Sequence, residues 1–423
     1  MGFRFVHAAD IHLDSPLRGL SAQEGAGIER IRKAPREAFD NLVGQVIDEE
    51  ADFLVIAGDL YDGDWRDYQT GLFFVSQMGR LAQAGIPVFL LYGNHDAEST
   101  ITRRLTLPDN VTVFSSRKPK SHYLNELGVV LHGHSYHHRD VTENLVPGYP
   151  EPVPGMFNIG VLHTGLGGLG GHQDYAPCAL TDLVNKGYDY WALGHVHQYQ
   201  IINTEPHVVF PGNLQGRHIR ETGPKGGCLV TVEDGSVTDV ATLPADVVRW
   251  AQVQVNVEGC DRQPDVIDQM RQAIERSVSE EAEGRLLACR LMLTGRTSLH
   301  GHILGAVGNL LAEARAAALG MGHEVAWIER VVVSTEPVVD AATLRQREDA
   351  MGEIRRQLDQ AAEDPALVEK LKADIGDFLN KLPHEIRSEL DSEMSQAVLD
   401  EDYPRMIQDA SDYLLARLTE EEG

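Results

Sequence analysis

Five short clusters of carboxylate, imidazole and amide side chains lie in the first two hundred residues. They are Asp10-Ile11-His12, Gly58-Asp59, Gly93-Asn94-His95-Asp96, His163-Thr164 and Gly194-His195-Val196-His197. Oxygen and nitrogen ligands of these kinds suit divalent ions such as Mn²⁺, Fe or Zn²⁺ without separating them cleanly. A carboxylate shared by two ions holds them about 3.5–4 Å apart, and the pair can activate a water and stabilise the oxygens displaced at phosphorus. The clusters therefore predict a dinuclear metal site with phosphoesterase chemistry.

Each cluster taken alone has an ordinary explanation. A histidine at a strand end often makes a structural hydrogen bond, and an aspartate there often caps a helix. Here, however, every cluster directly follows an apolar, strand-like run. Open α/β sheets place their sites at the carboxyl ends of strands. Five such positions together favour one shared site.

The elements expected to position these clusters alternate along the chain. Strand-like runs at 3–8, 53–57 and 87–91 are separated by amphipathic helical stretches at 29–50 and 68–84. This alternation predicts α/β units. Further strand-like runs follow at 111–114, 129–131, 158–162, 190–193, 207–210 and 228–232. Many strands with few helices predict an αββα sandwich of two sheets with helices outside.

Two further regions follow a boundary near Pro244–Asp246. Residues 246–338 repeat a strand–helix pattern that predicts a small βαβαβ cap domain. Residues 339–423 form a helical, acidic tail, in which the sequence from 341 on holds 21 Asp and Glu against 10 Lys and Arg. The expected domains are therefore 1–245, 246–338 and 339–423.

The order and types of the clustered residues resemble the calcineurin-like metallophosphoesterase superfamily over roughly residues 3–243. The resemblance implies one ion held by Asp10, His12, Asp59 and His197, and a second held by Asp59, Asn94, His163 and His195. It also implies that His95 protonates the leaving oxygen. Asp96 could orient His95, although a loop cap explains Asp96 equally well. Mn²⁺ is the favoured ion, with Mg²⁺, Fe and Zn²⁺ left open.

Residues 7–17, 163–168, 175–178 and 210–217 look like bacterial SbcD-type DNA repair exonucleases, especially their YhaO-like branch. The cap also sits where nucleases of the Mre-eleven type carry a DNA-capping domain. This resemblance implies an exonuclease subunit that hydrolyses DNA phosphodiesters with Mn²⁺, partners an SMC-like coiled-coil ATPase through its C-terminal helices, and can form a homodimer. Arg217, Arg220 and Tyr175 are candidate substrate contacts. One departure is Asp62, which stands where archaeal and eukaryotic relatives place a second histidine.

The net charge of −27 argues against strong DNA binding by the chain alone. Lys and Arg supply most non-specific affinity for phosphate backbones, so a partner with a basic groove is expected. No secretion signal is visible and no apolar run approaches the ~18 residues that span a membrane. These features predict a cytoplasmic protein without membrane contact.

Two other readings stay open. A small-molecule phosphodiesterase or a phosphoprotein phosphatase would use the same core and every ligand, but would have no use for the cap or the tail. A scaffold that regulates an ATPase would carry a vestigial metal site. The complete set of seven ligand positions disfavours the scaffold.

Overall fold

The computed structural model describes residues 2–15, 26–62, 68–97, 106–167, 175–338, 341–381 and 402–420. Positions 16, 17 and 168 of the motifs quoted above lie outside these ranges. The chain divides between Trp250 and Ala251 into two compact units. The second unit contains both the small sheet and the C-terminal helices, and each unit is described by itself.

Two six-stranded sheets form the first unit, in the orders β12-β11-β1-β2-β3-β4 and β5-β6-β7-β8-β10-β9. The strands of the first sheet are β1 (Phe3–Ala8), β2 (Phe53–Ala57), β3 (Val88–Leu91), β4 (Val111–Val113), β11 (Gly226–Glu233) and β12 (Ser236–Pro244). Those of the second are β5 (Lys120–Leu124), β6 (Val129–Gly133), β7 (Phe157–His163), β8 (Tyr190–Gly194), β9 (Gln200–Thr204) and β10 (His207–Phe210). Within them, β1 to β4 run parallel to one another, as do β6, β7, β8 and β10.

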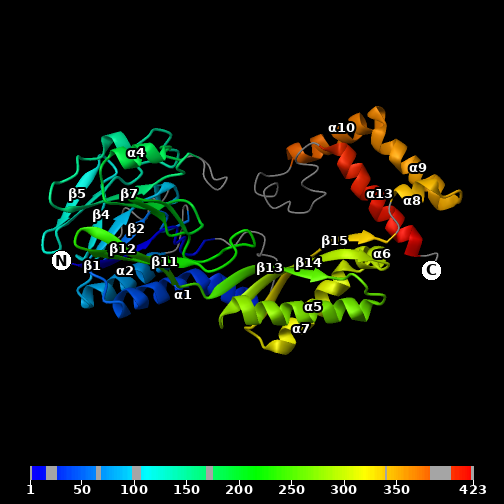
Figure 1. The fold of residues 1–423 in the computed structure, drawn as a ribbon, viewed down its shortest axis with the longest axis horizontal. Coiled ribbons are helices and arrows are strands. Elements are labelled where there is room, and N and C mark those ends of the chain that lie inside the picture. The colour runs from blue at the N-terminus through cyan, green and yellow to red at the C-terminus, as the bar shows by residue number, and fades with distance from the viewer. Residues whose placement is uncertain are drawn as a thin grey trace. The chain divides into compact units, whose positions relative to one another are not determined.

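Alternating side chains of the strands build the layers of this unit. Phe5 and Val55 face the core between the two sheets, whereas Val6 and Leu54 face α1 (Ala26–Asp48) and α2 (Tyr68–Gln83). On the far side, α4 (Leu180–Asn185) covers the second sheet through Leu183. Figure 1 shows α1 and α2 on one side of the strands and α4 on the other. The expected αββα sandwich is confirmed.

The second unit is built on a three-stranded sheet in the order β13-β14-β15. Its strands are β13 (Val248–Asn256), β14 (Leu286–Thr297) and β15 (Ala326–Pro337), and β14 pairs with β15 in parallel. Helices α5 (Gln263–Ser277) and α7 (Val307–Met321) pack on one face through residues such as Met270 and Leu310. A short helix, α6 (His300–Gly305), precedes α7. The βαβαβ arrangement is therefore confirmed.

The C-terminal region is helical, as expected. It contains α8 (Ala341–Gln346), α9 (Ala350–Glu363), α10 (Pro365–Lys381) and α13 (Tyr403–Glu420). Helix α13 packs against α6 and α9. The buried Arg355 of α9 pairs with Asp359, at 2.8 Å, and with Asp412 of α13. None of the described helices has both the length and the apolar character needed to cross a bilayer.

Candidate metal centre

The seven expected ligands all lie at or just after the carboxyl ends of five strands. Asp10 and His12 follow β1, Asp59 follows β2, Asn94 begins α3 (Asn94–Ala97) after β3, His163 ends β7, and His195 and His197 follow β8. The loops are joined by short hydrogen bonds. The amide of Asp10 donates to Gly58 O at 3.0 Å, and the amide of His195 donates to the Asp10 carboxylate at 2.9 Å. Ligands from both sheets therefore meet at one place.

Several ligands occupy strained backbone conformations. The φ angles of Asp10, His12 and Asp59 are 50°, 47° and 51°. Residues with a side chain rarely adopt this left-handed region, and each instance costs on the order of 1–3 kcal/mol unless the surroundings enforce it. Here they do, because the amide of His12 donates to Asp59 O at 3.0 Å. Such strain concentrates at functional sites.

Gly58 shows how closely the strand ends approach. Its φ is +101°, and a Cβ atom built on it would lie 2.4 Å from His163 Nδ1. Only a glycine has both the backbone freedom and the absence of a side chain that this contact requires. The Gly-Asp pairing noted in the sequence therefore brings Asp59 against His163.

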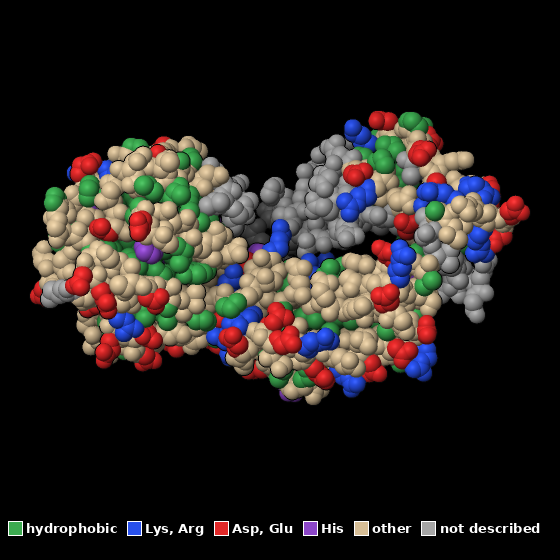
Figure 2. All heavy atoms as spheres, viewed as in Figure 1, with side chains coloured by type: hydrophobic (Ala, Val, Ile, Leu, Met, Phe, Trp, Pro, Cys, Tyr) green, Lys and Arg blue, Asp and Glu red, His purple; other side chains and the backbone are tan. Residues whose placement is uncertain are grey.

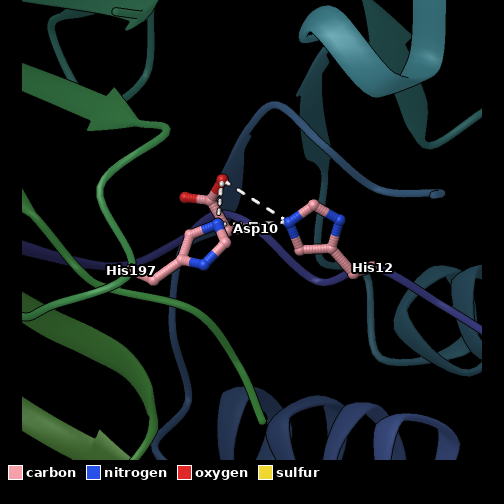
Figure 3. A group of neighbouring side chains, drawn as sticks. All are labelled: Asp10, His12 and His197. Carbon is pink, nitrogen blue, oxygen red and sulfur yellow. Dashed lines mark hydrogen bonds and ion pairs between the residues drawn. The ribbon is translucent and has the colours of Figure 1, made fainter. Parts of the chain in front are cut away.

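The first ligand group consists of Asp10, His12 and His197, whose ligand atoms converge in Figure 3. Asp10 Oδ1 lies 4.0 Å from His12 Nε2 and 3.7 Å from His197 Nε2, and the two nitrogens are 3.3 Å apart. Burial raises the pKa of Asp10, and its Oδ1 is buried without a hydrogen-bond partner. An unpaired buried carboxylate oxygen beside two imidazole nitrogens is costly unless a cation joins them. This donor set fits a divalent metal ion.

The second ligand group consists of Asp59, His163 and His195, with Asn94 beside them. His163 Nε2 lies 3.3 Å from Asp59 Oδ2 and 3.0 Å from Asn94 Oδ1. Burial opposes ionisation of Asp59, but the neighbouring His163 outweighs it and holds the pKa of Asp59 well below its usual range. Asp59 thus offers a charged carboxylate, which a second divalent ion requires.

Hydrogen bonds at the far side of two rings fix which nitrogen faces the centre. His163 Nδ1 donates to Ala57 O at 3.0 Å, and His197 Nδ1 donates to Glu221 at 2.7 Å. In each ring Nε2 then faces the other ligands and is the nitrogen that a metal ion would bind. Partners of this kind orient metal-binding histidines and raise their basicity. The arrangement therefore fits a metal centre better than a set of structural histidines.

His95 lies beside the first ligand group. Its ring centroid is 5.1 Å from that of His12, and its Nδ1 lies 2.7 Å from Asp62 Oδ1. Burial works against the imidazolium form, but the charge of Asp59 and the hydrogen bond that His95 donates to Asp62 outweigh it and raise the pKa of His95. A histidine held in this form can donate a proton.

Asp96 does not contact His95 in the way considered from the sequence. Its buried carboxylate accepts hydrogen bonds from the amides of Leu60, Tyr61 and Gly93, at 3.2, 2.9 and 3.0 Å. It therefore caps the loop after β2 and the turn before α3, which was the alternative explanation. Asp62 occupies the orienting position instead, because the turn after Asp59 brings its side chain to His95.

The three candidate substrate contacts differ in their surroundings. Arg217 has a side chain only 16% exposed and pairs with Asp62 and Glu221. Tyr175 is buried, with its ring centroid 5.5 Å from that of His195. Arg220 is exposed, and its amide donates to His218. Arg217 and Tyr175 thus adjoin the centre.

Sequence reasoning missed two carboxylates at this centre. Asp62 was noticed as a departure from relatives but not as the partner of His95. Glu221 was not singled out, although it bonds both His197 and, through Oε2, the amide of Arg217 at 2.7 Å. It lies 24 residues after His197, and only the turn from Pro211 to Glu221 brings the two together. The one sequence feature that could have pointed to Glu221 is its place directly after the basic run Arg217-His218-Ile219-Arg220.

The chain is similar to several known proteins. The calcineurin-like phosphoesterase family matches residues 3–199, and the middle domain of metallophosphoesterase YhaO matches residues 250–336. An uncharacterized metallophosphoesterase YhaO from Bacillus subtilis is 36% identical over 69% of this chain and 71% of its own length. The DNA double-strand break repair protein Mre11 of Methanopyrus kandleri is 25% identical over 46% of this chain and 44% of its own. A solved dimetal phosphatase from Danio rerio is similar with a TM-score of 0.35 and 11% identity, over 55% of this chain and 93% of that one.

The two ligand groups, the family matches and the Bacillus subtilis relative define a metallophosphoesterase with candidate sites for metal ions. More narrowly, the chain belongs to the YhaO-like branch of the calcineurin-like phosphoesterases.

Proposed function

We propose that this chain hydrolyses DNA phosphodiesters with two divalent ions, most suitably Mn²⁺, as the exonuclease subunit of a complex with an SMC-like coiled-coil ATPase. The observation that carries the proposal is the pair of buried ligand groups with His95 beside them. The choice of DNA is supported by the distant similarity to an Mre11 protein, which is itself named for double-strand break repair.

The residues of the centre would have different roles in such a reaction. When bound, the two ions would activate a water and neutralise charge on the phosphate oxygens. Asp10, His12 and His197 would hold one ion and Asn94, His163 and His195 the other, with Asp59 shared between them. His95, held by Asp62, donates a proton to the leaving oxygen. Tyr175 packs edge-on against His195, with ring centroids 5.5 Å apart.

A Mn²⁺ nuclease assay with the native chain, His95→Ala and Asp59→Ala tests the proposal. We expect His95→Ala to retain bound metal but to lose about 10²–10⁴-fold in turnover, the usual contribution of general acid–base catalysis. Asp59→Ala should lose both activity and metal. Full turnover by His95→Ala with unchanged metal content would refute the acid role.

The second candidate is a small-molecule phosphodiesterase or phosphoprotein phosphatase on the same core. The completeness of the ligand groups favours it as much as it favours a nuclease. Rates on blunt-ended, nicked and single-stranded DNA should be compared with those on a generic phosphodiester and a phosphomonoester. Preference for either small substrate over every DNA form would replace the nuclease assignment.

A further inference from the structure

One guanidinium is enclosed between two carboxylates at the margin of the metal centre. Arg217 Nη1 lies 3.5 Å from Asp62 Oδ2, and Arg217 Nη2 lies 3.3 Å from Glu221 Oε1. The side chains of Asp62 and Glu221 are only 18% and 6% exposed. Charges removed from water to this extent persist only when they are paired. Arg217, Asp62 and Glu221 therefore form one partly buried charge cluster.

Both carboxylates also hold a residue of the centre. Asp62 accepts a hydrogen bond from His95 Nδ1, and Glu221 accepts one from His197 Nδ1, each at 2.7 Å. Arg217 is thus linked through one carboxylate to the proton donor of the proposed reaction and through the other to a metal ligand. This double link fixes the guanidinium relative to the reacting groups.

The guanidinium is not saturated by these two carboxylates and by His197 Nδ1, which lies 3.3 Å from Arg217 Nη2. Its Nε is buried without a hydrogen-bond partner, and its contacts of 3.3 and 3.5 Å are long for charged pairs. In the second unit, by comparison, Arg290 forms a two-pronged pair with Glu329 in which both contacts are 2.8 Å. An unsaturated planar guanidinium is well suited to bind an additional oxyanion.

We propose that Arg217 binds a non-bridging oxygen of the scissile phosphate, with Asp62 and Glu221 as positioning residues. This inference rests on the proposed phosphodiester chemistry and supplies its phosphate contact. The substrate class is a phosphate ester whose anionic oxygens reach both the ions and this guanidinium.

The experiment measures orthophosphate binding by calorimetry on the Mn²⁺-loaded full chain, together with metal content and melting temperature. The variants are Arg217→Ala and Arg217→Lys, with Arg290→Ala as the matched control because it breaks a partly buried Arg–Glu pair within the second unit. We expect Arg217→Ala to bind phosphate about ten- to a hundredfold more weakly, as for a lost charged hydrogen bond. The phosphate affinity of Arg217→Lys should lie between those of the native chain and Arg217→Ala, and Arg290→Ala should bind phosphate as the native chain does.

Unchanged phosphate affinity in metal-loaded Arg217→Ala would overturn the inference and leave Arg217 a structural residue. The inference would also be overturned if both Arg217 variants lost metal and then bound phosphate normally when Mn²⁺ was supplied at saturating concentration. The outcome is separable from the proposed function. Suppose that the native chain cleaves a generic phosphodiester but not DNA, and that Arg217→Ala slows this cleavage. The nuclease assignment would then be refuted, and the phosphate contact of Arg217 would be retained.

Discussion

Gly93 lies directly against the carboxylate of Asp59, with no space for a side chain. A Cβ at this position would lie 2.3 Å from Asp59 Oδ1 and 2.9 Å from Asp59 N, so either the turn or Asp59 would have to move. We expect Gly93→Ala to lose bound metal and to hydrolyse phosphodiesters at least about a hundredfold more slowly, because a displacement of ~1 Å in a catalytic site can cost that much. Metal analysis and steady-state rates check this.

Gly44 of α1 provides the matched control. A Cβ there meets nothing within 4 Å. Gly44→Ala should retain metal and gain about 0.5–1 kcal/mol of stability, the usual benefit of alanine within a helix. If Gly93→Ala behaved like Gly44→Ala, the close approach to Asp59 would have no functional weight.

Asp62 and Asp96 offer a second comparison at this scale. Asp62 bonds the imidazole of His95, whereas Asp96 accepts three backbone amides. We expect Asp62→Asn, which keeps an oxygen facing His95 but loses the charge, to lower turnover about tenfold or more. Asp96→Ala should instead cost roughly 2–4 kcal/mol of stability, because buried amides lose their acceptor. Parallel kinetics and thermal unfolding separate the two, and a reversed pattern would restore Asp96 as the residue that orients His95.

At the scale of elements, Gln215 joins the site loop to the start of β13. Its buried side chain accepts hydrogen bonds from the amides of Val247 and Val248, at 2.9 and 3.3 Å, and donates to Val248 O at 2.6 Å. We expect Gln215→Ala to lower the free energy of unfolding by roughly 2–4 kcal/mol, since several buried backbone groups lose their partner. Exposed Gln252 of β13 is the control, and Gln252→Ala should change stability by less than ~0.5 kcal/mol. Chemical denaturation measures both, and equal effects would contradict this role.

The strands that sequence patterns missed are all edge strands. Apolar runs correctly predicted the central strands β1, β2, β3, β7 and β8, which are buried on both faces. Runs for β5, β9 and β12 were not recognised, and each of these lies at the edge of a sheet. An edge strand buries less of each face and carries polar residues that prevent unwanted pairing. The sequences of β5, β9 and β12 therefore lack the apolar signal, whereas the edge strand β4 has an apolar run and was predicted.

For the metal centre, the ligands were predictable from the sequence but the residues that orient them were not. The resemblance to a known family implied seven ligands, and the fold brings these seven residues together. The partners of His95 and His197 were not predictable, because Asp62 and Glu221 reach those rings only through turns. Residue chemistry is local in sequence, whereas orienting contacts depend on the folded loops.

At the scale of the whole molecule, charge is the dominant property. The chain carries 64 Asp and Glu against 37 Lys and Arg. On the face shown in Figure 2, acidic side chains are spread over both units. Such a surface repels a polyanion at distances comparable to the Debye length, about 8 Å at physiological salt. Two bound divalent ions would offset this repulsion only locally.

DNA affinity of the isolated chain should therefore be low. We expect the metal-loaded, cleavage-deficient His95→Ala chain to bind duplex DNA no more tightly than about 10⁻⁵ M at ~0.15 M salt, within the range of non-specific binding. Few Lys or Arg contacts also imply a shallow dependence of log affinity on log salt concentration. Fluorescence anisotropy at several salt concentrations measures both quantities. Nanomolar, salt-independent binding would contradict the need for a partner, whereas weak binding that an ATPase with a basic groove strengthens would place most of the phosphate recognition on that partner.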